Sequence, residues 1–208
     1  MRTLTKELRD KLTPDEALKV LKKGNERFVN NLKARRNLLE QVNETSEGQH
    51  PFAAILSCMD SRTSVELIFD QGLGDIFSIR IAGNILNEDI LGSLEFATKI
   101  AGSKIILVLG HTKCGAITAA CDNISLGSLT MLLDKIKPVI ESEAETKNQR
   151  NGSNPSFVFN VTKLNVRWVI DKICRESLII SELLRLGEIS LVGGLYDVDT
   201  GRVTFFEK

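Results

Sequence analysis

Residues 104–116 read KIILVLGHTKCGA and decide the fold class. The branched apolar run over residues 104–109 is typical of a buried strand. We expect Gly110 to end this strand and a helix to begin directly after Cys114. His111 and Cys114 would then lie in a loop that follows the carboxyl end of a strand.

An earlier segment has the same organisation. Residues 52–57 read FAAILS, a short apolar run that predicts a second buried strand, and Cys58 follows it directly. In open parallel α/β sheets, ligands bind at the carboxyl ends of the strands. The two strand ends can therefore bring Cys58, His111 and Cys114 together, although the first lies far from the other two in the sequence.

Strands and helices alternate along the rest of the chain. Further strands are expected over residues 75–82, 189–195 and 203–206, with a hairpin turn at Asp199-Thr-Gly201. Helices are expected over 14–41, 64–69, 89–101, 126–149 with a kink at Pro138, and 158–186 with Gly187 as the C-cap. This alternation predicts a single α/β domain with a central, mainly parallel β-sheet flanked by helices.

The composition limits the class of protein and its compartment. The chain has 208 residues, and its 27 Lys and Arg residues balance its 27 Asp and Glu residues, so it lacks the basic excess that nucleic-acid binding needs. The longest strongly apolar run, residues 105–109, is far too short to cross a bilayer, and the N-terminus has no signal-peptide pattern. We therefore expect a soluble, cytoplasmic protein that binds neither nucleic acid nor membrane. Four cysteines are too few for a disulfide scaffold, and they favour thiol or metal chemistry.

Two thiols and an imidazole at adjoining strand ends suit a zinc ion. Zinc accepts Cys and His ligands, and a set of three leaves the fourth position open, as in catalytic sites. With two thiolates the first shell is formally neutral, so a zinc-bound water should have a pKa above the value of about 7 reached in strongly polarising sites. We therefore expect an activity that rises toward alkaline pH, and a flat rate profile would contradict this. The alternative for Cys58 and Cys114 is an inert place in the core.

A carboxylate and a guanidinium follow Cys58 at alternate positions, Asp60 and Arg62. On an extended segment, alternate residues share a face, so all three can point into one pocket. Arg62 can hold the Asp60 carboxylate ionised through a bidentate pair, and the carboxylate can then orient a zinc-bound hydroxide. Asp60 could instead swing onto the metal as a fourth ligand and close the site.

Three motifs occur in order: Cys58-Met-Asp-Ser-Arg62, Arg80-Ile-Ala-Gly-Asn84 and Gly110-His-Thr-Lys-Cys-Gly115. Together with the tail Gly193-Gly-Leu-Tyr-Asp197, they resemble the β-class carbonic anhydrases over nearly the whole chain. The resemblance implies reversible hydration of CO₂ to bicarbonate and a proton by zinc-bound hydroxide, with one Zn²⁺ per subunit. It also implies Cys58, His111 and Cys114 as zinc ligands, and Asp60 with Arg62 as the catalytic dyad.

The resemblance further implies substrate contacts and an assembly. Gln49 matches an amide that family members contribute to the substrate pocket across a dimer interface. Phe77 and Ala82 match apolar pocket positions, and the Gly115 backbone lies beside the substrate. The family fold places an N-terminal helical arm over a partner subunit, so a homodimer or homotetramer is implied. Its parts would be the arm at residues 1–48, a zinc-site core at 49–125, and C-terminal helices and strands at 126–208.

Other functions are compatible with parts of the pattern. The nearest alternative is a hydrolase of a CO₂ analogue such as carbonyl sulfide or carbon disulfide, which the same superfamily includes and pocket shape would decide. A zinc-stabilised binding module without turnover would need a fourth firm ligand or would lack the arginine, and the Asp60–Arg62 pair argues against it. A redox dithiol protein is disfavoured because the sequence contains no Cys-x-x-Cys.

Overall fold

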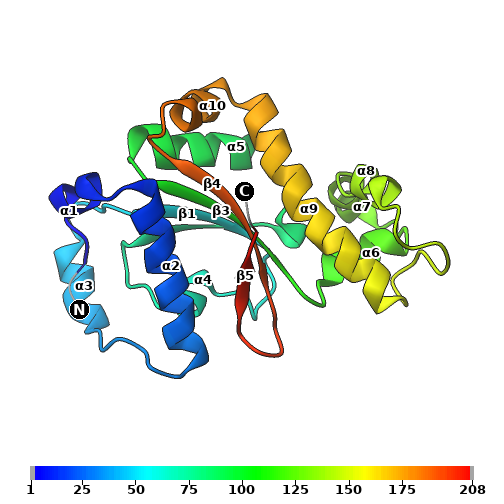
Figure 1. Cartoon of the computed structure of the whole chain (residues 1–208), viewed down its shortest axis with the longest axis horizontal. Coiled ribbons are helices and arrows are strands. Elements are labelled where there is room, and N and C mark those ends of the chain that lie inside the picture. The colour runs from blue at the N-terminus through cyan, green and yellow to red at the C-terminus, as the bar shows by residue number, and fades with distance from the viewer. Residues whose placement is uncertain (1–2, 207–208) are drawn as a thin grey trace.

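The computed structural model describes residues 3–206 and centres on a five-stranded sheet. The strands are β1 (Ala53–Ser57), β2 (Ile76–Arg80), β3 (Ile105–His111), β4 (Ser190–Tyr196) and β5 (Val203–Phe205). Their order is β2-β1-β3-β4-β5; the first four are parallel, and β5 runs antiparallel to β4. The prediction of an α/β fold with a mainly parallel central sheet is confirmed (Figure 1). Residues 1–2 and 207–208, the ends of the predicted domain, lie outside the described residues.

Helices α2 (Pro14–Val29) and α4 (Val65–Ile68) cover one face of the sheet. A capping box starts α2: the Thr13 hydroxyl accepts from the Glu16 N–H, and the Glu16 carboxylate accepts from the Thr13 N–H. Ala17 and Leu21, one turn apart, are fully buried in the core that α2 shares with β1 and β3. This N-terminal helix therefore packs one face on the chain's own sheet, and the arm over a partner subunit that the resemblance implied stays a prediction.

The opposite face is covered by α5 (Glu88–Glu95), a π-helical turn η2 (Phe96–Ile100), α9 (Pro155–Glu176) and α10 (Leu178–Arg185) (Figure 1). The prediction of one helix over 158–186 is wrong, because Ser177 divides it. The Ser177 hydroxyl accepts from the Ile180 N–H to cap α10, and it donates to the Glu95 carboxylate of α5. Gly187 follows α10 in the left-handed region (φ 70°), as expected of a C-cap. Among residues 3–206, no helix combines the length and apolar character needed to cross a membrane.

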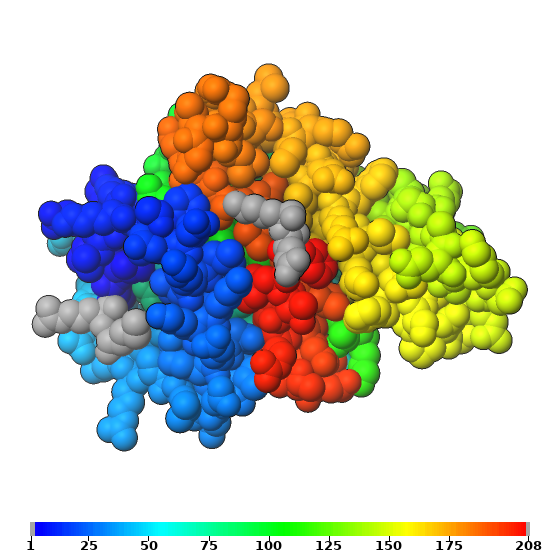
Figure 2. Space-filling view, viewed as in Figure 1, coloured from blue at the N-terminus to red at the C-terminus, as the bar shows by residue number. Residues whose placement is uncertain are grey.

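The short helices α6 (Gly115–Cys121), α7 (Gly127–Leu133) and α8 (Lys137–Ser142) lie together to one side of the sheet (Figure 1), and the yellow-green segment that includes α8 projects from the body of the molecule (Figure 2). The predicted helix over 126–149 is wrong, since α7 and α8 are separate and helical structure ends at Ser142. Pro138 lies in the first turn of α8, where a missing N–H costs nothing, so it starts a helix instead of kinking one. The following loop is held by the buried Glu143 carboxylate, which accepts hydrogen bonds from Thr146 and Arg150.

The N-terminal segment forms the separate helices α1 (Lys6–Lys11), α2 and α3 (Leu38–Glu44), where the sequence predicted one helix. The single helix expected over 14–41 is wrong: α2 ends at Val29, and Asn31 turns the chain with φ 54°. The chain turns because Asp70, buried beside α4, attracts the segment that follows. Its carboxylate accepts from the Ala34 N–H and from Arg36, which lies 2.5 Å away. A buried carboxylate must be paired, and this pairing outweighs the propensity of the segment to continue as helix.

Gly110 has a different role from the predicted one, because β3 continues through it and ends at His111. A Cβ atom at position 110 would lie 2.7 Å from Cγ2 of Val166 on α9. Glycine is therefore required where the helix approaches the strand most closely. Since the strand continues, His111 is held by ladder pairing with Tyr196 and does not lie in a free loop.

Candidate metal centre

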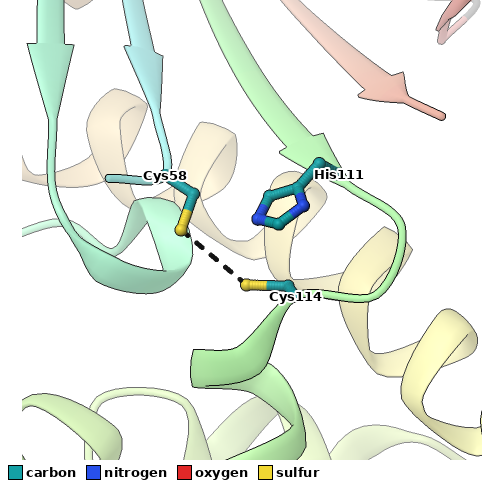
Figure 3. Close-up of side chains that lie close together, drawn as sticks. All are labelled: Cys58, His111 and Cys114. Carbon is teal, nitrogen blue, oxygen red and sulfur yellow. Dashed lines mark hydrogen bonds between the residues drawn. The ribbon is translucent and has the colours of Figure 1, made fainter. Parts of the chain in front are cut away.

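Cys58, His111 and Cys114 meet at the carboxyl ends of β1 and β3 (Figure 3). Cys58 directly follows β1, His111 is the last residue of β3, and Cys114 is the N-cap of α6. Their ligand atoms all lie within 4.8 Å of one another, and the two sulfur atoms are 3.9 Å apart. The prediction that two distant segments bring these side chains together is confirmed, and the cluster could hold a metal ion.

The His111 ring has one nitrogen engaged and the other free toward the thiols. Nδ1 lies 2.9 Å from the carbonyl oxygen of Thr112. A carbonyl only accepts, so Nδ1 carries the proton and Nε2 presents its lone pair. Nε2 is buried and has no hydrogen-bond partner among the described residues. A buried acceptor left unpaired is costly, and a cation between Nε2 and the two sulfur atoms would satisfy it.

The two thiols differ in their electrostatic surroundings. The hydrogen bond from Cys114 lowers the pKa of the Cys58 thiol, and the Gly83 N–H, which donates to the Cys58 sulfur, acts in the same direction against burial. The same sulfur–sulfur contact, together with burial, raises the pKa of Cys114. One thiolate is therefore favoured without a cation. The donor set of two sulfur atoms and one imidazole nitrogen fits Zn²⁺, which binds deprotonated thiols and neutral imidazole.

Asp60 and Arg62 form a bidentate ion pair next to this cluster. Nε of Arg62 lies 2.9 Å from Oδ1 of Asp60, and Nη2 lies 2.8 Å from Oδ2. The backbone N–H of Arg62 also donates to Oδ1, and Nη2 reaches the carbonyl of Lys113 beside Cys114. Hydrogen bonds from Arg62 hold the pKa of the Asp60 carboxyl far below its usual range. The Asp60 carboxylate is therefore a fixed hydrogen-bond acceptor that does not take up protons near neutral pH.

The local backbone differs from the expected extended segment. Residues 60–63 form a turn, closed by a hydrogen bond from the Thr63 N–H to the Asp60 carbonyl. The pair therefore forms across a turn and not along one face of a strand. Asp60 is outside the three-residue cluster, so its role as a fourth metal ligand stays a prediction.

Two further residues, which the sequence analysis missed, hold this turn in place. Arg80 donates to the carbonyl oxygens of Cys58 and Asp60, and the buried Thr63 hydroxyl lies 2.8 Å from the same two oxygens. Arg80 opens the Arg80-Ile-Ala-Gly-Asn84 motif, so a signal for it was available. Thr63 carried no signal, because its bonds run to backbone carbonyls of a turn that was expected to be extended.

The predicted substrate residues lie in three places. Ala82 and Gly115 lie beside the cluster, at the turn η1 (Ala82–Asn84) and at the start of α6. Phe77 pairs with Ala54 in the middle of the sheet edge, and its ring packs against Phe96 with centroids 6.3 Å apart. Gln49 lies beside Gly74, before the amino ends of β1 and β2. Within one chain, the length of β1 separates Gln49 from Cys58.

An α/β sheet that gathers two thiols and an imidazole at adjoining strand ends, with a carboxylate–guanidinium pair beside them, defines a candidate metalloenzyme. The family profile described as carbonic anhydrase matches residues 53–203. The chain belongs to the carbonic anhydrase family, and its solved structural neighbours are β-carbonic anhydrases.

The similarity to individual relatives extends over most of the chain. Carbonic anhydrase 2 of Mycobacterium tuberculosis is 36% identical over 190 residues, which cover 91% of both chains. The carbonic anhydrase of Mycolicibacterium smegmatis is 31% identical, covering 91% of this chain and 92% of the relative. The β-carbonic anhydrase of Coccomyxa, solved with acetazolamide, has a TM-score of 0.72 at 25% identity, and the match covers 80% of this chain and 76% of the Coccomyxa chain. CafA of Aspergillus fumigatus has a TM-score of 0.70 at 26% identity, covering 81% of both chains.

Proposed function

We propose that this chain is a zinc-dependent carbonic anhydrase that catalyses the reversible hydration of CO₂ to bicarbonate and a proton. The observation that carries the proposal is the unpartnered Nε2 of His111, buried within reach of the Cys58 and Cys114 sulfur atoms. The family membership supports the same reaction, since the curated relatives are named carbonic anhydrases.

Cys58, His111 and Cys114 would hold one Zn²⁺ per subunit. An ion bound by these three ligands supplies a Lewis acid that activates water at its open position. The Thr112 carbonyl fixes the tautomer of the His111 ring, so that Nε2 is the ligand atom. The apolar side of the cluster, which includes Ile85 and Ile117, suits CO₂, a molecule with little capacity for hydrogen bonding.

Asp60 would orient the reacting water, and Arg62 would hold Asp60 in place. An oxygen atom of the ionised Asp60 carboxylate can accept a hydrogen bond from that water. This hydrogen bond orients the water so that a lone pair of its oxygen points toward the substrate. Because its pKa is so low, Asp60 does not take up the proton that the reaction releases at neutral pH. That proton must leave through another group or through solvent.

We also propose a homodimer or homotetramer in the cytoplasm, in which Gln49 of one subunit serves the site of another. Gln49 lies at the amino end of the sheet, whereas Cys58 of the same chain lies at the carboxyl end.

We expect Gln49→Ala to keep its zinc and to lower the rate of CO₂ hydration by about tenfold, which corresponds to the loss of one substrate hydrogen bond. Mixed oligomers of Gln49→Ala and Cys58→Ser subunits should recover activity only if Gln49 of one subunit acts at the site that contains Cys58 of another subunit. Equal loss in every mixture, or a monomer by analytical ultracentrifugation, would contradict the arrangement.

Zinc analysis combined with stopped-flow CO₂ hydration tests the proposed function. We expect one Zn²⁺ per chain and rapid hydration, with slower turnover of carbonyl sulfide and carbon disulfide. Faster turnover of either analogue than of CO₂ would instead establish the alternative hydrolase. Stoichiometric zinc without turnover of any of these substrates would indicate a binding module.

A further inference from the structure

The backbone of Gly83 links the candidate metal centre to helix α9. Its N–H donates to the Cys58 sulfur over 3.3 Å, and its carbonyl accepts from Nδ2 of Asn165 over 2.9 Å. Both hydrogen bonds are buried, and Asn165 is only 1% exposed. One glycine therefore connects a candidate metal ligand with a side chain 82 positions later in the sequence.

The turn that contains Gly83 depends on outside contacts for its conformation. Gly83 (φ 66°) and Asn84 (φ 42°) are both in the left-handed region, which non-glycine residues adopt rarely, although asparagine does so more readily than most. Such a pair of residues persists only when surrounding groups fix it. The Asn165 amide is one of these groups, since it binds the carbonyl between the two left-handed residues.

The place of Asn165 on α9 is otherwise hard to explain by packing. Its neighbours Val161, Val166 and Val169 on the buried side of the helix are apolar, and the hydroxyl of the buried Thr162 bonds within the helix. A buried amide gains nothing over an apolar side chain there unless its hydrogen bond is needed. The one hydrogen bond that it donates in the described structure is directed at the turn beside Cys58.

We propose that Asn165 is a positioning residue for the metal centre, which aims the Gly83 N–H at the Cys58 sulfur by holding the Gly83 carbonyl. The proposal rests on the zinc-dependent function proposed above. Hydrogen bonds to ligand atoms orient the ligands and tune the metal, and losing such a partner typically weakens metal affinity by about 10- to 100-fold. Asn165 would act on the ion through two successive hydrogen bonds, so the lower end of this range is expected.

Two variants and one control test the proposal on the full chain. Asn165→Asp keeps the size of the side chain but replaces the donor by an oxygen, and Asn165→Leu removes all hydrogen bonding. Thr162→Val is the control, because Thr162 is 2% exposed on the same helix and its hydroxyl bonds only within α9, to the Val158 carbonyl. The readouts are the Zn²⁺ dissociation constant by chelator competition, the sulfur-to-cobalt charge-transfer band of Co²⁺-loaded protein, and thermal unfolding of the metal-free protein.

We expect both Asn165 variants to bind Zn²⁺ about tenfold more weakly and to shift the charge-transfer band, while Thr162→Val lowers only the unfolding temperature. Unchanged affinity and spectrum in the Asn165 variants, or equal losses in Thr162→Val, would overturn the proposal. If neither Asn165 variant folds, wild-type protein loaded with ¹¹³Cd decides: the Gly83 amide should show scalar coupling to the metal, and absence of that coupling overturns the role. A wild-type protein that takes up no Zn²⁺ would instead refute the proposed function itself.

Discussion

A Cys58→Ser variant should contain no stoichiometric zinc and should hydrate CO₂ at least about 1,000-fold more slowly than wild type, because the reaction loses the Lewis acid that activates water. Serine matches cysteine in shape, but its hydroxyl does not ionise near neutral pH and is a poor zinc ligand. Without Cys58 only His111 and Cys114 remain, and among the described residues the cluster contains no other side chain that could serve as the third ligand. Metal analysis and stopped-flow hydration on the same preparation measure both effects.

Cys121→Ser is the matched control for this variant. Cys121 is a buried free thiol in the same apolar cluster as Cys58 and Cys114, yet it is not among the three clustered ligands. It should keep full zinc content and rate, with at most a modest loss of stability from placing a hydroxyl in an apolar site. Full zinc in Cys58→Ser, or equal loss of zinc in Cys121→Ser, would show that the cluster does not hold the metal.

The sheet could be predicted from the sequence because its strands are short apolar runs that end in polar or glycine-containing turns. Several helix ends could not, since long-range hydrogen bonds decide them. Ser177 interrupts the C-terminal helical segment partly because its hydroxyl binds Glu95 of α5. The segment after α2 leaves the helix because Asp70 binds Ala34 and Arg36. These hydrogen-bond partners lie far away in the sequence, so the local pattern of apolar residues does not indicate them.

The centre of the site was predictable for a different reason. Cys58, His111 and Cys114 are chemically distinctive residue types placed directly after apolar runs, so position and chemistry indicated the same site. Gly110 was misread as a strand terminator because its actual constraint, the approach of Val166, comes from another helix. Asn165 gave no signal at all, since its partner at position 83 is remote in sequence and is a backbone carbonyl.

Replacing Arg62 tests whether the ion pair keeps the metal site open. The Arg62 side chain binds both oxygens of Asp60, so Arg62→Ala would leave the carboxylate with only the backbone N–H of residue 62 and allow it to turn toward a cation at the cluster. We expect this variant to keep one zinc per chain but to hydrate CO₂ about 100-fold or more slowly, in line with losing a positioned acceptor. X-ray absorption at the zinc edge should show a fourth protein ligand, with oxygen added to the two sulfur atoms and one nitrogen.

The pH dependence separates this closure from a simple change of ionisation. Hydrogen bonds from Arg62 lower the folded-state pKa of Asp60, so in wild type the carboxylate is ionised above that lowered value and loses its charge only as pH falls through it. Without the Arg62 side chain the pKa of Asp60 returns toward about 3.9, still well below neutral, so Asp60 remains ionised and a change in its protonation cannot account for a slower variant at neutral pH. Lys113→Gln is the control, because Lys113 is an exposed cation paired with Asp199 in the adjoining loop and its side chain does not bind Asp60. An Arg62→Ala protein whose zinc keeps only three protein ligands, or an equal loss in Lys113→Gln, would assign Arg62 a general electrostatic role and remove the case for a closing carboxylate.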